Sequence, residues 1–339
     1  MLELFKTRLT NLGTQSTWLA ASIGAFLLYL LGAALLGIHW SQTAEQSPID
    51  DILATTAPSD QRLTIGNATV GTLIFITDTL LEKPGGYLTN DVTPPGLWLD
   101  NMPNWEFGVL VQARDLARAL RKDLSRSQSQ STEDRDLVIA EPALNYDSQK
   151  WFPSAESSYK KALKSLQSYQ IRLATPGENA QVYARADNLH NYLADVETRL
   201  GSLSQRLSAS VGQARFNTDL AGDPAASQST LDVSERVIKT PWMKIDDVFF
   251  EARGSAWALL HILRAVERDF GAVLDDKNAR VSLKQVVREL EATQQTVWSP
   301  MILNGSGFGI FANHSLVMAS YIARAHAAIS DLRALLTLG

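Results

Sequence analysis

The segment SPMILNGSGFGIFANHS, residues 299–315, carries the residue types best suited to binding a ligand. Asn313 directly precedes a stretch with helical periodicity, where its side-chain oxygen can cap the helix by accepting a free N–H. His314 and Ser315 then fall in the first turn. Because N–H groups at a helix start attract anions, one interpretation is a phosphate or carboxylate site. Its candidate residues, with Tyr87 added from a second loop at 84–107, are Asn304, Gly305, Gly307, Asn313, His314, Ser315 and Tyr87.

Two other interpretations of residues 299–315 stay open. The first is a structural connection between helices, in which glycines adopt left-handed dihedrals while Phe308, Ile310 and Phe311 pack back onto the domain. The second is an exposed tip, GFGIF at 307–311, that contacts a membrane or a partner. Replacing Asn313 and His314 together by alanine separates binding from capping. Binding predicts lost function in a folded protein, and capping predicts a stability loss of about 1 kcal/mol.

No other pattern in the chain is typical of catalysis or metal binding. The absence of cysteine excludes disulfides, thiol catalysis and cysteine-based metal sites. None of the five histidines forms an HxxH or HExxH pair, and there is no GxSxG or GxxxxGK[ST] motif. His261 lies in an apolar helix and is expected to be a core histidine. We therefore expect no catalytic residue, no metal and no cofactor.

Composition sets the class of protein. Hydrophobic residues make up 45% of the 339 residues and charged residues 20%, which predicts a mostly folded chain. Lys and Arg number 31 against 36 Asp and Glu, so the net charge is −5. A nucleic-acid-binding protein needs a basic face, so we expect no nucleic-acid partner.

A long apolar segment near the N-terminus predicts a transmembrane helix at residues 18–40. No Asp, Glu, Lys or Arg lies between Trp18 and Trp40, and a helix of this length spans roughly the 30 Å of a bilayer core. The two tryptophans bracket it at the positions that interfaces favour. A cleaved signal peptide would have a shorter apolar region and a small-x-small cleavage site. We therefore favour an uncleaved anchor, with the lipid bilayer as a partner.

The charges around this helix predict its orientation. Lys6 and Arg8 precede it, while Glu45, Asp50 and Asp51 follow it. The positive-inside rule then places residues 1–17 in the cytoplasm and the chain after about residue 40 outside it. Small residues at Ala20, Gly24 and Gly32–Gly37 would let two such helices approach, so a homodimer is a further hypothesis.

The elements that must position the candidate residues are helices. Residues 41–61 are polar, contain two prolines and read as a linker. Helical patterns follow at 66–83, 109–124, 245–274, 281–297 and 314–336, and breaks at 127–134 and 221–231. No stretch alternates with a period of two for long. The prediction is one all-α domain at 62–339, a helical bundle behind a single transmembrane helix.

The clearest amphipathic region is residues 154–210. From Leu189 to Leu207, apolar residues repeat with spacings of 4, 3, 4, 3 and 4, which is typical of a coiled-coil seam. A short Pro-Gly turn at 175–179 precedes this stretch. Two helices joined by such a turn predict a coiled-coil-like antiparallel hairpin at about 154–210.

Three segments carry a family resemblance. TLLEKPGGYLTND at 79–91, SAWALLHILRAVERDF at 255–270 and the stretch from ILNGSGFG to DLRALL at 302–336 together resemble a bacterial inner-membrane family of unknown function, DUF 2333. The resemblance covers most of the chain from about residue 62 onward. It implies a bacterial source, a single N-terminal anchor and one continuous domain, and it supplies no catalytic residues.

Two functions remain as hypotheses. The leading one is a non-enzymatic, single-pass inner-membrane protein whose periplasmic helical bundle contacts other envelope proteins as a scaffold. Its basis is the coiled-coil-like region, the many tryptophans and the lack of a recognisable catalytic set. The alternative is an envelope lipid- or anion-binding protein, or an enzyme, with a site built from the 299–315 and 84–107 loops.

Overall fold

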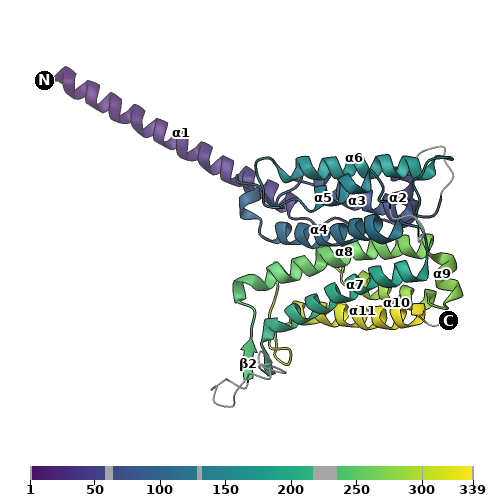
Figure 1. The fold of residues 1–339 in the computed structure, drawn as a ribbon. Helices are drawn as coiled ribbons and strands as arrows, with labels where there is room; N and C mark the ends of the chain where they lie inside the picture. The colour runs from purple at the N-terminus through teal and green to yellow at the C-terminus, as the bar shows by residue number, and fades with distance from the viewer. Residues whose placement is uncertain (1, 58–63, 128–131, 217–234, 300, 338–339) are drawn as a thin grey trace, which may run out of the picture.

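The computed structural model describes residues 2–57, 64–127, 132–216, 235–299 and 301–337. A long N-terminal helix, α1 (Leu2–Trp40), extends from a helical domain (Figure 1). Within the described residues, Trp18–Trp40 is the one helix long and apolar enough to cross a bilayer, and only 6% of its most apolar window is buried. The prediction of an all-α fold with one N-terminal apolar helix is confirmed.

The domain consists of two layers of helices (Figure 1). The upper layer holds α2 (Ile49–Thr56), α3 (Asn67–Glu82), α4 (Asn101–Ala119), α5 (Leu137–Leu144) and α6 (Ala155–Ala174). The lower layer holds α7 (Ala186–Ser208), α8 (Ile245–Asp269), α9 (Gly271–Asp276), α10 (Arg280–Ala292) and α11 (His314–Thr337). The described residues also form four short turns of helix: η1 (Gly96–Trp98), η2 (Leu120–Leu124), η3 (Ala209–Val211) and η4 (Trp242–Lys244). One continuous apolar core runs through both layers.

Helices α4 and α8 join the layers in direct backbone contact. A Cβ atom added at Gly108 of α4 would lie 2.1 Å from the Glu251 carbonyl oxygen of α8. One added at Gly254 of α8 would lie 2.1 Å from the Trp105 carbonyl oxygen of α4. Such distances are far inside van der Waals contact, so only glycine at both positions permits this approach.

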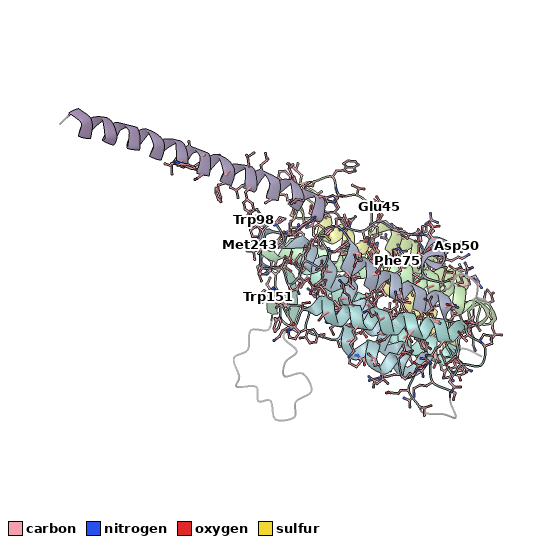
Figure 2. The ribbon with its side chains drawn as sticks, turned by 90° about the horizontal axis from the view of Figure 1, so that it is seen from above. Glu45, Asp50, Phe75, Trp98, Trp151 and Met243 are labelled. Carbon is pink, nitrogen blue, oxygen red and sulfur yellow. The ribbon has the colours of Figure 1, made fainter. Side chains whose placement is uncertain are left out.

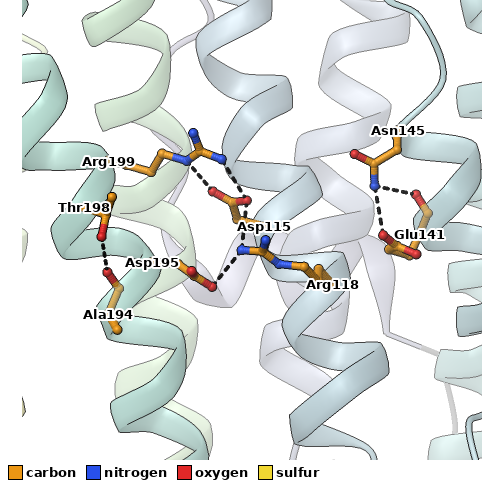
Figure 3. A network of polar contacts seen from close by, with 8 residues as sticks. All are labelled: Asp115, Arg118, Glu141, Asn145, Ala194, Asp195, Thr198 and Arg199. Carbon is orange, nitrogen blue, oxygen red and sulfur yellow. Dashed lines mark hydrogen bonds and ion pairs between the residues drawn. The ribbon is translucent and has the colours of Figure 1, made fainter.

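A polar network also ties the two layers (Figure 3). Arg199 of α7 donates from Nε to Asp115 Oδ2 of α4 at 2.7 Å. Arg118 of α4 donates to Asp195 of α7 at 2.8 Å and to Asp115 at 3.3 Å. The Asp115 side chain is only 8% exposed, so its charge depends on these two arginines for compensation.

The predicted hairpin at 154–210 is wrong in its pairing. Both helices exist, but α6 packs on α3 and α5, while α7 packs along α11 in the other layer (Figure 1). The apolar residues of α7 from Leu189 to Leu207 are buried against a matching stripe of α11 from Met318 to Leu336. The spacing thus identified a helix with a buried seam, whereas the Pro-Gly turn indicated the wrong partner for it.

The predicted linker, residues 41–61, contains folded structure up to residue 57. Helix α2 lies within it, with Ile52 and Leu53 buried. Before α2, the chain runs across α8. Trp257 Nε1 donates to the Glu45 carbonyl at 3.0 Å, and Ser47 N donates to His261 Nε2 at 3.0 Å. The segment after α1 is therefore attached to the domain through its backbone.

The structure adds a short two-stranded ladder that the sequence did not predict. Strands β1 (Gln213–Phe216) and β2 (Glu235–Ile238) pair antiparallel, with Gln213 opposite Ile238. The predicted break at 221–231 falls outside the described residues, as does part of the break at 127–134.

Candidate functional site

The connection from α10 to α11 folds back on itself around residues 303–314. Gly305 N donates to the Ala312 carbonyl and His314 N donates to the Leu303 carbonyl, both at 3.0 Å. Asn304 and Asn313 form an isolated antiparallel bridge between these two bonds. Gly307 turns the chain at φ +86°, a conformation that favours glycine. The loop is therefore a small built structure with its own backbone pairing.

Asn313 caps α11 as the sequence predicts. Its Oδ1 accepts from Leu316 N at 2.9 Å, and its Nδ2 donates to Asn304 Oδ1 at 2.8 Å and to the Gly305 carbonyl at 2.6 Å. Asn304 Nδ2 in turn donates to the Ser210 carbonyl at 3.0 Å, next to the end of α7. The side-chain groups of both asparagines are thus engaged in holding the loop.

His314 and Ser315 retain bonding capacity. Leu303 N donates to His314 Nδ1 at 3.1 Å, so the neutral ring carries its proton on Nε2. The Ser315 hydroxyl is buried and has no partner among the described residues. Among the side chains predicted to bind an anion in this loop, His314 therefore offers a ligand its Nε2–H, whereas the amide groups of Asn304 and Asn313 are already engaged.

Tyr87 belongs to a different environment. It is buried, donates to the Ser148 carbonyl at 3.2 Å and meets the Tyr159 ring edge-on at a centroid distance of 5.4 Å. Burial, and then the neighbouring Tyr159, raise the pKa of its phenol above the ordinary value. These contacts come from residues 148 and 159 and none from 299–315, so Tyr87 serves the packing of the upper layer.

The tip of the loop is exposed. Phe308, Ile310 and Phe311 have relative exposures of 105%, 99% and 73%. The expectation that these three residues pack back onto the domain is therefore wrong. Their exposure agrees with the alternative of an apolar tip that protrudes from the domain.

A cavity of about 300 Å³ lies beside His314. Phe249 and Arg253 of α8 form one wall, and His314, Val317 and Tyr321 of α11 form another. The third side is formed by residues 292–293 and 295–299. No Asp or Glu stands among its described lining residues. Arg253 is not among the candidate residues that the sequence suggests. Its local signal is a basic residue in the largely apolar stretch FFEARGSAWALL, which does not show whether a carboxylate pairs with it.

Arg253 is a buried cation with no carboxylate partner among the described residues. The residue is only 8% exposed. Its Nη1 donates to the Gln295 carbonyl at 2.9 Å and its Nη2 to the Gln294 carbonyl at 3.1 Å, while Nε has no partner. Burial lowers the pKa of the guanidinium below its ordinary value, which starts high enough for the group to stay charged.

The other buried charged side chains that the structure describes have partners of opposite charge within the domain. Lys83 and Glu106 form an ion pair at 2.5 Å, and Glu106 also accepts from Leu88 N and Thr89 N, each at 2.8 Å. This carboxylate thereby fixes the start of the 84–107 loop. Arg172 binds Asp134 and Asp136, each at 2.6 Å. The described residues contain no group of three or more His, Asp or Glu able to hold a metal.

Comparison with known proteins yields one match. The model of a family described as an uncharacterised protein conserved in bacteria, DUF2333, matches residues 13–339. No curated protein matches the chain, and no solved structure matches it. The family supplies no residue roles, so the chemistry of the site rests on the geometry given above.

Proposed function

The chain belongs to the bacterial family DUF2333, and from the arrangement of its helices we propose that it is a single-pass inner-membrane protein. In this proposal residues 18–40 cross the bilayer, residues 1–17 lie in the cytoplasm and the helical domain lies in the periplasm. The domain serves there as an interaction module for other envelope proteins, without catalysis. Its orientation follows from Lys6 and Arg8 before the helix and the acidic residues after it.

The observation that carries membrane anchoring is how α1 leaves the domain. Ala33 and Gly37, four residues apart on one face, are buried, while most of the large apolar residues from Trp18 to Ile38 are exposed. A Cβ added at Gly37 would lie 3.5 Å from Pro95 and 3.8 Å from Leu99. An exposed apolar helix of this length, held at its last turns, is best explained by a bilayer around it.

Exposed large apolar residues at one end of the domain support the same proposal. Trp98, Trp151 and Met243 lie at the end of the domain from which α1 extends (Figure 2). Their relative exposures are 51%, 66% and 78%, and Phe152 and Trp242 beside them are 80% and 75% exposed. Tryptophan favours the headgroup region of a bilayer. In this proposal these residues, here called the proximal face, rest on the membrane surface.

The anchor and its orientation are tested in two steps. An N-terminal tag that stays with the full chain in the membrane pellet after alkaline extraction is expected for an uncleaved anchor. Loss of the tag indicates a cleaved signal peptide. A reporter that is active only in the periplasm, fused after Gly339, is expected to be active. A silent reporter on a stable fusion contradicts the orientation.

The interaction role is supported by the protruding tip at 307–311. Three large apolar side chains exposed within five residues are costly in water unless a partner covers them. A photo-crosslinking amino acid at Phe308 is expected to capture a discrete envelope protein in living cells, and the same probe at exposed Gln167 of α6 is not. Replacing Ile310 and Phe311 by aspartate should abolish that product. Equal products from both probe positions contradict the proposal.

A further inference from the structure

We propose that the cavity between α8 and α11 is a binding site for an anion that carries an apolar chain, such as an alkyl phosphate or a fatty-acid carboxylate. Arg253 supplies the positive charge, His314 supplies a second N–H, and Phe249, Val317 and Tyr321 supply the apolar wall. The site is independent of the tip at 307–311 and of the side of the membrane on which the domain lies.

The charge of Arg253 is the first argument. Removing a cation from water without a counter-charge is expensive, and two backbone carbonyls offset only part of that cost. Every other buried cation described above has a carboxylate, as Lys83 has Glu106 and Arg172 has Asp134 and Asp136. An anion in the cavity would complete the compensation at Arg253.

The donors are the second argument. Nε of Arg253 is buried without a partner, and each terminal nitrogen of the guanidinium has one further N–H beyond its carbonyl bond. His314 adds Nε2–H, because Nδ1 is occupied by Leu303 N. Donors from two different helices therefore line one cavity that has no acidic residue among its described lining.

The apolar wall indicates the rest of the ligand. Phe249 and Met318 are buried beneath the cavity, and Val317 and Trp298 border it with exposures of 55% and 92%. A free inorganic anion would leave this wall in contact with water, whereas an alkyl chain would cover it. Arg253 also lines a second hollow formed with residues 41–46, the segment that directly follows α1. The polar end of the site therefore lies next to the exit of the membrane helix.

The test uses the full chain in phosphatidylcholine nanodiscs and short, water-soluble probes. Hexyl phosphate and hexanoate are titrated by calorimetry, with empty nanodiscs as the blank. The matched variants are Val317→Asp and Val317→Asn, because Val317 borders the cavity and is exposed in the first turns of α11. A carboxylate there is tolerated near a helix N-terminus, so Val317→Asp is expected to fold.

The expected result is binding of at least one probe to the wild type, weakened by about tenfold or more in Val317→Asp and changed less than about twofold in Val317→Asn. Arg253→Met should also lose binding. Because this change removes the hydrogen bonds to the Gln294 and Gln295 carbonyls, the variant could fail to fold, and the two Val317 variants then decide the test. The proposal is overturned if neither probe binds, or if Val317→Asp binds as the wild type does. If hexanol binds as tightly as the charged probes, the site does not require an anion and the proposal fails. If inorganic phosphate binds as tightly, the site does not require an apolar chain and the proposal fails as well.

The lipid composition of the nanodisc distinguishes two sources of such a ligand. If a membrane phospholipid fills the site, nanodiscs that contain phosphatidylglycerol should suppress hexyl phosphate binding in the wild type. If the ligand is a free amphiphile, binding should be the same in both kinds of nanodisc.

Discussion

At the scale of single residues, Asn313 has two separable tasks. Its oxygen caps α11 through Leu316 N, and its amide nitrogen holds Asn304 and the Gly305 carbonyl. Replacing Asn313 by alanine removes all three bonds, so we expect the free energy of unfolding to fall by about 1–2 kcal/mol. Urea unfolding of the detergent-solubilised chain measures this.

Two variants sharpen the test. Asn313→Ser keeps a capping oxygen and loses the amide donor, so it should retain part of the stability that alanine loses. Ser306→Ala, at an exposed position of the same loop, should change stability by less than about 0.5 kcal/mol. If Asn313→Ala is as stable as Ser306→Ala, the cap does not stabilise the protein.

His261 is a core histidine, as the sequence predicts. Its Nε2 accepts from Ser47 N at 3.0 Å and its Nδ1 lies 2.7 Å from the Trp257 carbonyl, so the neutral ring carries its proton on Nδ1. Burial lowers the pKa of His261 from 6.5 to about 4, and Arg264 adds to the shift. Protonating Nε2 would break the bond that holds the segment after α1.

This pKa sets a direction for the effect of pH on stability. The unfolded chain takes up the proton near pH 6.5, whereas the folded chain takes it up only near pH 4. The contribution of His261 to stability is therefore complete above pH 6.5 and is lost as the pH falls toward 4, by about 3 kcal/mol in all. Urea unfolding across this pH range gives the free energy of unfolding at each pH. Its slope against pH should be shallower in His261→Gln than in the wild type. An unchanged slope would contradict the role given to His261.

At the scale of elements, the crossing of α4 and α8 depends on two glycines. A methyl group at Gly254 would lie 2.1 Å from the Trp105 carbonyl oxygen, and backbone cannot move aside cheaply. Gly254→Ala is expected to cost at least about 2 kcal/mol or to prevent folding. Thermal unfolding followed by circular dichroism measures the loss. The control is Gly32→Ala in α1, where an added Cβ meets nothing within 4 Å and the domain should keep its stability.

Helix periodicity predicted elements well and their partners poorly. The spacing of α7 and α11 is the same 4, 3 pattern, and the two helices indeed bury these stripes against each other. The hairpin of α6 and α7 was inferred from the Pro-Gly turn between them, but a turn fixes only neighbours in sequence. Pairing depends on which apolar stripes fit in three dimensions, and spacing alone does not contain that information.

The site could be predicted only in part, for a related reason. Asn313 was recognisable because a cap is a local signal. Arg253 was not, because its lack of a carboxylate depends on which residues α10 and α11 bring to α8. The attachment of residues 45–47 could not be predicted either. It uses the backbone carbonyl of Glu45 and the backbone amide of Ser47, and every residue except proline has both groups, so the sequence does not mark them.

At the scale of the whole molecule, α1 is fixed to the domain rather than tethered to it. Gly37 lies against Pro95 and Leu99, and the Trp40 ring lies against Gly85, where a Cβ would come within 2.7 Å. Gly37 precedes Trp40 by three residues, so it lies ~4.5 Å deeper along the helix. The loop that holds η1 therefore sits level with the last turn of the proposed span, and in the proposed orientation Trp98 would lie at the membrane interface.

This geometry predicts which side chains meet lipid. The chain contains no cysteine, so a single cysteine can carry an environment-sensitive fluorophore at one chosen position. In liposomes, a label at Trp98→Cys should be shielded from iodide and quenched by lipid-borne quenchers. A label at Gln167→Cys, twelve residues along α6 from its start and thus ~18 Å from it, should respond in the opposite way. Equal access of iodide to both labels would mean that the proximal face does not rest on the bilayer, even if residues 18–40 span it.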